Sequence, residues 1–367
     1  MKIGLVIGIR PEVVKMGPVI KYCIKNKLDY FVIHTGQHYS YNMDGVFFEE
    51  LELPEPKYNL EVGSGTHGRQ TAKMIEKIED ILVKEKPYIV LVYGDSNSSL
   101  AGALSAVKLN IKVGHIEAGL RSFDRAMPEE INRVVTDHIS DFLFVPSKIS
   151  EKHALQEGIN KNKIFVTGNT AVDSIKQNLK IAENKSNIMK KMCLEKDNFF
   201  LATCHRAGNV DVKENLKCIL DNFGEIFSKF NFPIVFPIHP RTKKMIEEHN
   251  LKIPKGIIIS EPLSYFDFLK LEENAKVIFT DSGSIQEEAC VLKVPCITMR
   301  ENTERQETLE VGSNVLVDID KEKTIRAVSE MINKDKNWVN PYGDGKTAEK
   351  IIKIIQKEFI KNVAESL

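Results

Sequence analysis

The chain is 367 residues long and 42% hydrophobic, and this length exceeds what one hydrophobic core usually supports, so it favours two domains. Its 51 lysines and arginines balance 51 aspartates and glutamates, which excludes a global electrostatic attraction to nucleic acid or to an anionic membrane. The sequence has no apolar run of about 18 residues, and its N-terminus turns polar too soon for a signal peptide, so we expect a cytoplasmic protein.

Short β-branched segments alternate with amphipathic segments through the first half of the chain. Segment 69–86 has the apolar spacing of a helix. Strands joined by such helices form right-handed βαβ units, which build a parallel sheet covered on both faces. The expected strands lie at 2–8, 30–36, 88–94, 112–119, 141–146 and 164–168.

The same alternation restarts after a lysine-rich helical stretch at 173–197, with strands expected at 199–205, 233–239, 256–262, 277–282, 295–299 and 314–320. We therefore predict an α/β protein with two Rossmann-like domains, at 1–172 and 173–346. An amphipathic helix at 347–367 is expected to pack back on the first domain. Because ligands of open α/β sheets bind outside the carboxyl ends of the strands, the predicted site lies in the cleft between the domains.

The six cysteines form no Cys-x-x-Cys pair, and no histidine has the spacing of a zinc ligand. We expect neither a disulfide framework nor a metal centre.

The stretch "GIRPEVVK" places Arg10 and Lys15 around the start of a helix. A helix start carries partial positive charge, so cations there suggest a bound anion. The alternative is two solvated surface charges. The absence of G-x-G-x-x-G argues against a dinucleotide cofactor in this domain.

Three carboxylates follow strands or open helices in the first domain. Asp95 follows one strand, Glu117 follows the next, and Glu129 opens a helix in which Arg133 lies one turn later. Grouped carboxylates could carry out proton transfer. The alternatives are a helix cap for Asp95, a core salt bridge for Glu117, and an ordinary surface pair for Glu129 and Arg133.

The second domain offers groups that bind anions. His205 and Arg206 follow a strand, and the turn 282–284 opens a helix whose N–H groups could hold a phosphate. Glu287 or Glu288 could accept from ribose hydroxyls, and Phe268 could flank a base. The alternatives are an ordinary capped helix and an aromatic ring packed in the core.

Taken together, the motifs resemble the non-hydrolysing UDP-N-acetylglucosamine 2-epimerase family over nearly the whole chain. The resemblance implies a GT-B-like pair of Rossmann domains that bind a UDP-sugar in the cleft, no redox or other cofactor, and a homodimer. The matching stretches, in order, are "GIRPEVVKMGPVI", "TGQH", "VLVYGDSNSSLA", "VGHIEAGLRS", "PEEINR", "TGNTAVD", "HRAGN", "TDSGSIQEEA", "TERQE" and "NPYGDG".

The resemblance also implies roles for individual residues. The catalytic set would be Asp95, Glu117, Glu129 and His205. The substrate-binding set would be Arg10, Lys15, Arg133, Arg206, Leu263, Phe268, Ser282, Gly283, Ser284, Glu288 and Arg305.

The implied reaction inverts the second carbon of the sugar. The family eliminates UDP to give 2-acetamidoglucal and then adds UDP back as a proton arrives on the opposite face. Because two faces are involved, two proton-transfer groups are needed. The product, UDP-N-acetylmannosamine, would supply polysaccharide biosynthesis.

The chain departs from the family pattern in three motifs. Ala207 and Gly208 stand in "HRAGN" where the family has an arginine and a glutamate, and Gln306 replaces a proline in "TERQE". Bacterial relatives bind a second UDP-N-acetylglucosamine as an activator. Gln37, His38 and Arg69 occupy the corresponding stretches, but "QHYSYN" differs from the usual Q-H-R.

Other functions remain open from the sequence. They are a hydrolysing epimerase that releases UDP and N-acetylmannosamine, a UDP-sugar glycosyltransferase, and a regulatory protein that binds UDP-sugar without turnover. The three carboxylates argue against the last, because a sensor has no need of them.

Overall fold

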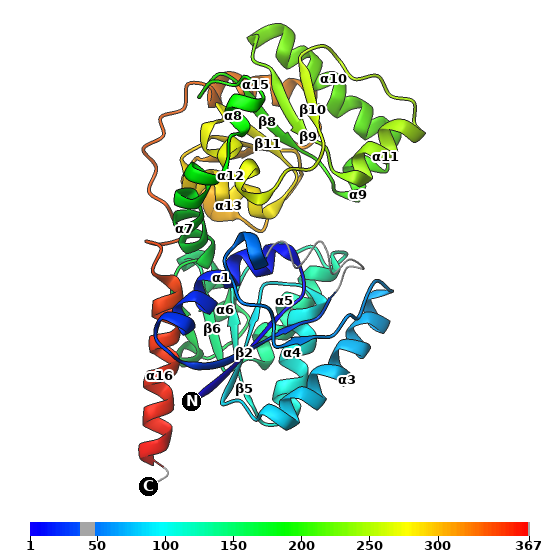
Figure 1. The fold of residues 1–367 in the computed structure, drawn as a ribbon. Coiled ribbons are helices and arrows are strands. Elements are labelled where there is room, and N and C mark those ends of the chain that lie inside the picture. Colours follow the sequence, from blue (N-terminus) through cyan, green and yellow to red (C-terminus); the bar gives the residue numbers. More distant parts are fainter. Residues whose placement is uncertain (37–47, 366–367) are drawn as a thin grey trace. The chain divides into compact units, whose positions relative to one another are not determined.

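The computed structural model describes residues 1–36 and 48–365, which form two compact units (Figure 1). Unit 1 comprises residues 1–174 and 342–367, and unit 2 comprises residues 175–341. Each unit has a parallel sheet with helices between its strands. The predicted α/β class with two Rossmann-like domains is confirmed.

The sheet of unit 1 has the strand order β3-β2-β1-β4-β5-β6-β7, and each described pairing is parallel. This order reverses direction between β1 and β4, which is the topological switch point where such sheets bind ligands. The two-residue strand β3 was not predicted. The strands are β1 Lys2–Ile7, β2 Asp29–His34, β3 Tyr58–Asn59, β4 Ile89–Tyr93, β5 Lys112–Ile116, β6 Phe142–Val145 and β7 Ile164–Val166.

Helices of unit 1 cover its sheet with apolar faces. Met74 and Ile78 of the predicted helix at 69–86, which runs from 67 to 85, pack with Val6 and Val92 of the central strands. The helices are α1 Arg10–Lys25, α3 His67–Glu85, α4 Asn97–Lys108, α5 Pro128–Ile139, α6 Lys148–Gln156 and α16 Thr347–Glu365, with a short 3₁₀ turn at Lys161–Lys163. Helix α7 Thr170–Lys185 begins in unit 1 and continues into unit 2.

Unit 2 repeats this architecture with the strand order β10-β9-β8-β11-β12-β13. Its core contains edge-to-face rings, in which Phe223 lies 6.1 Å from Phe236 and 5.4 Å from Phe279. The strands are β8 Phe200–Thr203, β9 Ile234–Pro237, β10 Ile257–Ser260, β11 Val277–Thr280, β12 Cys296–Thr298 and β13 Asn314–Leu316. The helices are α8 Ile188–Lys191, α9 Ala207–Val210, α10 Lys213–Phe230, α11 Pro240–Glu248, α12 Tyr265–Asn274, α13 Gly283–Leu292, α14 Gln306–Glu310 and α15 Lys321–Met331.

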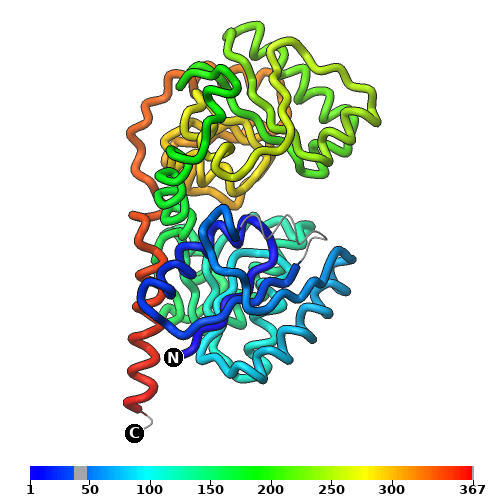
Figure 2. Tube along the Cα trace, viewed as in Figure 1, coloured from blue at the N-terminus to red at the C-terminus, as the bar shows by residue number. Residues whose placement is uncertain are grey.

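The chain leaves unit 1 within α7 and returns to it at residue 342, as the tube in Figure 2 traces. The returning helix α16 lies along unit 1, where the Phe359 ring is 4.8 Å from that of Tyr88. No helix in the described part of the chain combines the length and apolar character needed to cross a membrane.

Candidate active site

The β1–α1 turn places Arg10 and Lys15. A Cβ at Gly8 would lie 1.9 Å from Ser98 Oγ, so only glycine fits where the chain turns. The Glu12 carboxylate accepts from the N–H groups of Gly8 at 2.6 Å and Ile9 at 3.3 Å. The Glu12 side chain therefore accepts from the backbone N–H groups at the start of α1, next to the half-buried Arg10.

Glu117 follows β5 and is held by three donors. Its Oε2 accepts from Lys15 Nζ at 3.0 Å, Tyr93 Oη at 2.8 Å and Asn169 Nδ2 at 3.1 Å. Only 6% of Glu117 is exposed, and these donors compensate for the loss of water. The partner of Lys15 is thus a carboxylate within unit 1. Tyr93 and Asn169 were not predicted as site residues, although both lie in the matched stretches.

Asp95 follows β4 and pairs with Arg133 of α5. Arg133 Nη1 contacts Asp95 Oδ2, and Arg133 Nε lies 2.9 Å from Glu130 Oε2. The alternative of an ordinary surface pair between Glu129 and Arg133 is not observed, because the buried guanidinium contacts the buried Glu130 instead. Glu129 is half-buried and forms no ion pair with any residue that the structure describes.

Glu130 also fixes the loop before α5. It accepts from the N–H groups of Ser122 at 3.1 Å and Phe123 at 2.9 Å. Burial raises the pKa of Glu130, but these hydrogen bonds and Arg133 lower it by more. The pKa of Glu130 therefore lies below its ordinary value. Sequence reasoning chose the first glutamate of "PEEINR", whereas the second is built into the fold.

The first-domain carboxylates are arranged as separate ion pairs. Asp95 and Glu117 follow neighbouring strands, and a Cβ at Gly94 would lie 3.5 Å from Glu117 Oε1. Each of the two has its own cation, Arg133 and Lys15. The structure thus brings Asp95 and Glu117 to one edge of the sheet, each with a charge partner.

In unit 2, Asp281 joins two strand ends. This fully buried carboxylate follows β11 and accepts from the N–H groups of His205 and Arg206, both at 2.9 Å. His205 Nδ1 also lies 3.1 Å from it. Burial raises the pKa of Asp281, but His205 and the two N–H groups lower it more, to about 2. Asp281 was missed, although it opens the motif "DSGS".

The turn at 282–284 leads into α13. Ser282, Gly283 and Ser284 are half-buried, and a Cβ at Gly283 would lie 2.2 Å from Glu304 Oε1. Arg305 is buried, with its Nε 3.2 Å from Glu287 Oε1. Backbone N–H groups at the start of α13 can therefore face an anion next to a buried cation.

Three more predicted residues lie on or before α12 and α13. Leu263 and Phe268 pack against a core cluster of unit 2. Glu288 is half-buried and faces Glu272, whose pKa is raised well above its ordinary value by burial and then by Glu288. Glu288 therefore has a second carboxyl group as its neighbour.

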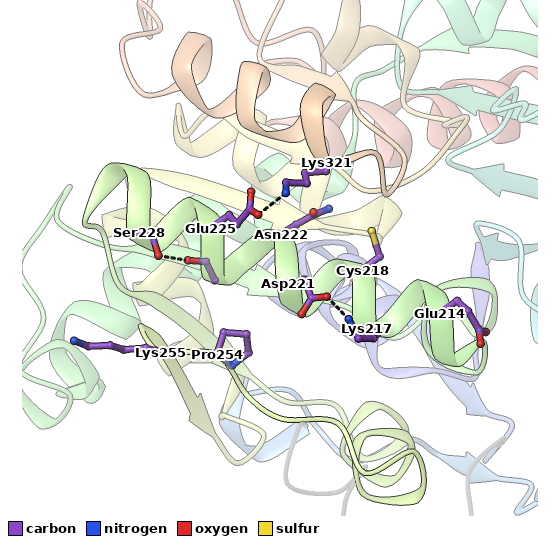
Figure 3. Close-up of a pocket in the computed structure, with 11 residues that line it drawn as sticks. Glu214, Lys217, Cys218, Asp221, Asn222, Glu225, Ser228, Pro254, Lys255 and Lys321 are labelled. Carbon is purple, nitrogen blue, oxygen red and sulfur yellow. Dashed lines mark hydrogen bonds and ion pairs between the residues drawn. The ribbon is translucent and has the colours of Figure 1, made fainter.

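One open pocket of unit 2 lies along α10 (Figure 3), and none of the predicted site residues lines it. Four of its charged side chains form two pairs, Lys217 with Asp221 at 2.6 Å and Lys321 with Glu225. Exposed pairs of this kind are worth little, and they leave the pocket with balanced charge. Its lining residues are Glu214, Lys217, Cys218, Asp221, Asn222, Gly224, Glu225, Ser228, Pro254, Lys255 and Lys321.

Comparisons with known proteins identify the family of this chain. A profile of UDP-N-acetylglucosamine 2-epimerase matches residues 22–356. The chain belongs to this family. A UDP-N-acetylglucosamine 2-epimerase from Methanocaldococcus jannaschii is 57% identical over 97% of this chain and 99% of the relative. A UDP-2,3-diacetamido-2,3-dideoxy-D-glucuronate 2-epimerase from Pseudomonas aeruginosa is 40% identical over 97% of this chain and all of the relative.

A solved epimerase structure from Methanocaldococcus jannaschii, in complex with UDP-GlcNAc and UDP, superposes with a TM-score of 0.91. It is 57% identical and covers 97% of this chain and 100% of its own. Among the residues proposed for an epimerase activator site, Arg69 is exposed in the first turn of α3, and Gln37 and His38 lie outside the described residues. Within the described residues, no group of three or more His, Cys, Asp or Glu side chains could hold a metal ion.

Proposed function

We propose that the protein interconverts UDP-N-acetylglucosamine and UDP-N-acetylmannosamine at the second carbon of the sugar. The observation that carries the proposal is the pair Asp95 and Glu117 at neighbouring strand ends, each with its own cation. Proton transfer on two faces of a sugar needs two such groups. The relative at 57% identity is named for this activity.

The proposed mechanism begins with removal of the hydrogen at the second carbon and departure of UDP, which leaves 2-acetamidoglucal. UDP then adds back to the first carbon, and delivery of a proton to the opposite face of the second carbon gives the epimer. Glu117 is proposed as one proton carrier because Lys15, Tyr93 and Asn169 fix its orientation. Asp95 is proposed as the other, and Glu129 remains a candidate.

Unit 2 is proposed to hold the UDP portion. The start of α13 offers N–H groups to the diphosphate, and His205 and Arg206 lie in the turn that Asp281 fixes. Arg10, at the start of α1, is proposed to stabilise the departing diphosphate. Glu288 is proposed at the ribose, Leu263 and Phe268 at the uracil, and Arg305 in the supporting shell.

NMR in deuterated water tests the function. Incubation with UDP-N-acetylglucosamine should give UDP-N-acetylmannosamine with deuterium at the second carbon. Free N-acetylmannosamine would instead indicate the hydrolysing reaction, and no exchange would refute both. A parallel incubation with UDP-2,3-diacetamido-2,3-dideoxy-D-glucuronate separates this substrate from UDP-N-acetylglucosamine.

Glu117→Gln tests the residue that carries the mechanism. The amide keeps the size of the side chain but cannot take a proton, so exchange should fall by about a thousandfold or more. UDP affinity, measured by calorimetry, should stay within about threefold because unit 2 is unchanged. A large loss of UDP binding would contradict the role given to Glu117.

A further inference from the structure

A buried network in unit 1 is hydrogen-bonded to the two turns that carry Asp95 and Glu117. Its members are His115 of β5, Asp137 of α5 and Arg121, each 1% exposed or less. The proposed mechanism gives none of them a role. Burial of this many charged or polar groups is costly unless each finds partners in a fixed geometry.

His115 joins Asp137 to the turn before Asp95. Its Nδ1 lies 2.6 Å from Asp137 Oδ1, and its Nε2 lies 2.8 Å from the carbonyl oxygen of Gly94. Both neighbours are hydrogen-bond acceptors, and the ring bridges them. The ring therefore ties α5 to the residue immediately before Asp95.

Asp137 joins the same ring to the turn after Glu117. Its Oδ2 accepts from the Gly119 N–H at 3.0 Å and from Arg121 Nη2 at 2.7 Å. Arg121 is itself fixed by two 2.7 Å hydrogen bonds to Glu157. Burial raises the pKa of Asp137, but His115 and Arg121 together hold it below its ordinary value.

The two turns need such support because their backbone is unusual. Gly94, Glu117 and Gly119 have φ of 64°, 69° and 78°. Glu117 is not glycine, and a side chain strains the backbone in this left-handed region, so the conformation persists only where the surroundings impose it. The network forms hydrogen bonds with the backbone of both turns, through the Gly94 carbonyl before Asp95 and the Gly119 N–H after Glu117.

We propose that His115 and Asp137 are positioning residues, which together hold the turns of Asp95 and Glu117 at the spacing that proton transfer requires. We call these two residues and their hydrogen bonds to the turns the clamp. Its effect on catalysis rests on the proposed function, but the clamp itself is a property of the fold. Neither residue contacts substrate in this assignment; both act through the backbone of the carboxylate turns.

Asp137→Asn tests the clamp with little change of shape. The amide oxygen can still accept from Gly119 and Arg121, but its NH₂ group would face His115 Nδ1, which must then accept rather than donate. Glu151→Gln is the matched control, because Glu151 lies on neighbouring α6 and pairs with Lys148 and Lys161 instead of the network.

The first readout is hydrogen exchange of the backbone amides, measured by mass spectrometry on peptides that span 93–97 and 116–121. Asp137→Asn should raise exchange in both peptides by about tenfold or more, and Glu151→Gln should leave both unchanged. Unchanged exchange in both peptides of Asp137→Asn would overturn the proposal, whatever activity the protein has.

The second readout is catalytic. In the NMR assay of deuterium incorporation into the sugar, Asp137→Asn should lower kcat per folded molecule by about tenfold or more, with KM changed by less than about threefold. If amide exchange rises while kcat stays within about twofold of wild type, the clamp does not serve catalysis and the proposal fails. A wild type that shows no deuterium incorporation would refute the proposed function alone, since the amide readout is independent of it.

Discussion

Glu12 is a buried carboxylate of unit 1 whose pKa is raised to nearly neutral pH. Burial raises its pKa from an ordinary 4.5 to about 7, with a smaller contribution from Asp95, and hydrogen bonds from Ser96, Gly8 and Ile9 only partly oppose this. In the folded protein the group therefore holds its proton to a higher pH than in the unfolded chain.

The sign of the linkage follows from that difference. Between about pH 4.5 and about pH 7 the folded state binds more protons than the unfolded state, so the free energy of unfolding falls as pH rises, by up to about 3 kcal/mol. Glu12→Gln keeps an acceptor for the Gly8 N–H but cannot titrate. Its stability relative to wild type should rise across this window.

Urea unfolding at about pH 5 and about pH 8, followed by circular dichroism, measures this effect. Glu61→Gln, an exposed position, serves as the control and should follow the wild type. Equal pH dependence in Glu12→Gln and wild type would show that Glu12 does not titrate in this window.

Sequence reasoning at the residue scale found the carboxylates and their cations Lys15 and Arg133 as site residues, but not the neutral donors to Glu117. Asp95 and Glu117 could be predicted because each directly follows an apolar strand. Tyr93 and Asn169, which both donate to Glu117, could not be predicted from spacing. They are 76 residues apart in the chain and meet only through the fold. Sequence reasoning chose Glu129 and did not anticipate that Glu130 pairs with Arg133, because helical spacing allows either glutamate to reach Arg133.

At the scale of elements, the approach of α6 to the β5 turn constrains Gly119. A Cβ there would lie 2.4 Å from the Ser150 carbonyl oxygen, and the backbone φ is 78°. Gly158 has a similar φ of 83°, but a Cβ there would meet nothing within 4 Å. The two glycines therefore separate the cost of the backbone conformation from the cost of a steric clash.

Gly119→Ala should lower the free energy of unfolding by about 2–4 kcal/mol, because the clash with backbone adds to the strained φ. Gly158→Ala should lower it by only about 1 kcal/mol. Urea unfolding of both variants measures the difference. Similar losses would mean that α6 can move away from the turn at little cost.

Elements were easier to predict than their ends or their order. Alternating apolar strands and amphipathic helices indicated β1, β2 and β4–β7, because buried parallel strands are almost continuously apolar. The strand β3 was missed because two residues carry no periodic signal. The order of the strands depends on contacts between distant segments, although the right-handed crossover rule restricts it.

At the scale of the whole molecule, the return of the chain to unit 1 depends on a cap at the start of α16. Asp173 of α7 accepts from the N–H groups of Thr347 at 3.1 Å and Ala348 at 3.0 Å. Burial raises the pKa of Asp173, and these hydrogen bonds offset part of that shift. Farther along the helix, Asn362 Nδ2 donates to Tyr88 Oη at 2.8 Å.

Asp173→Ala should loosen α16 without unfolding the sheet of unit 1, because it leaves two buried N–H groups without their acceptor, at a cost of about 1–3 kcal/mol. Limited trypsin digestion followed by intact mass measurement should show cleavage near Lys346 at least about fivefold faster than in wild type. Glu349→Gln, whose carboxylate pairs with exposed Lys353 on the same helix, should digest like wild type. UDP affinity of Asp173→Ala should stay within about threefold of wild type, because Asp173 lies in unit 1 and UDP is proposed to bind unit 2. Loss of UDP binding together with faster cleavage would mean that the cap supports both units.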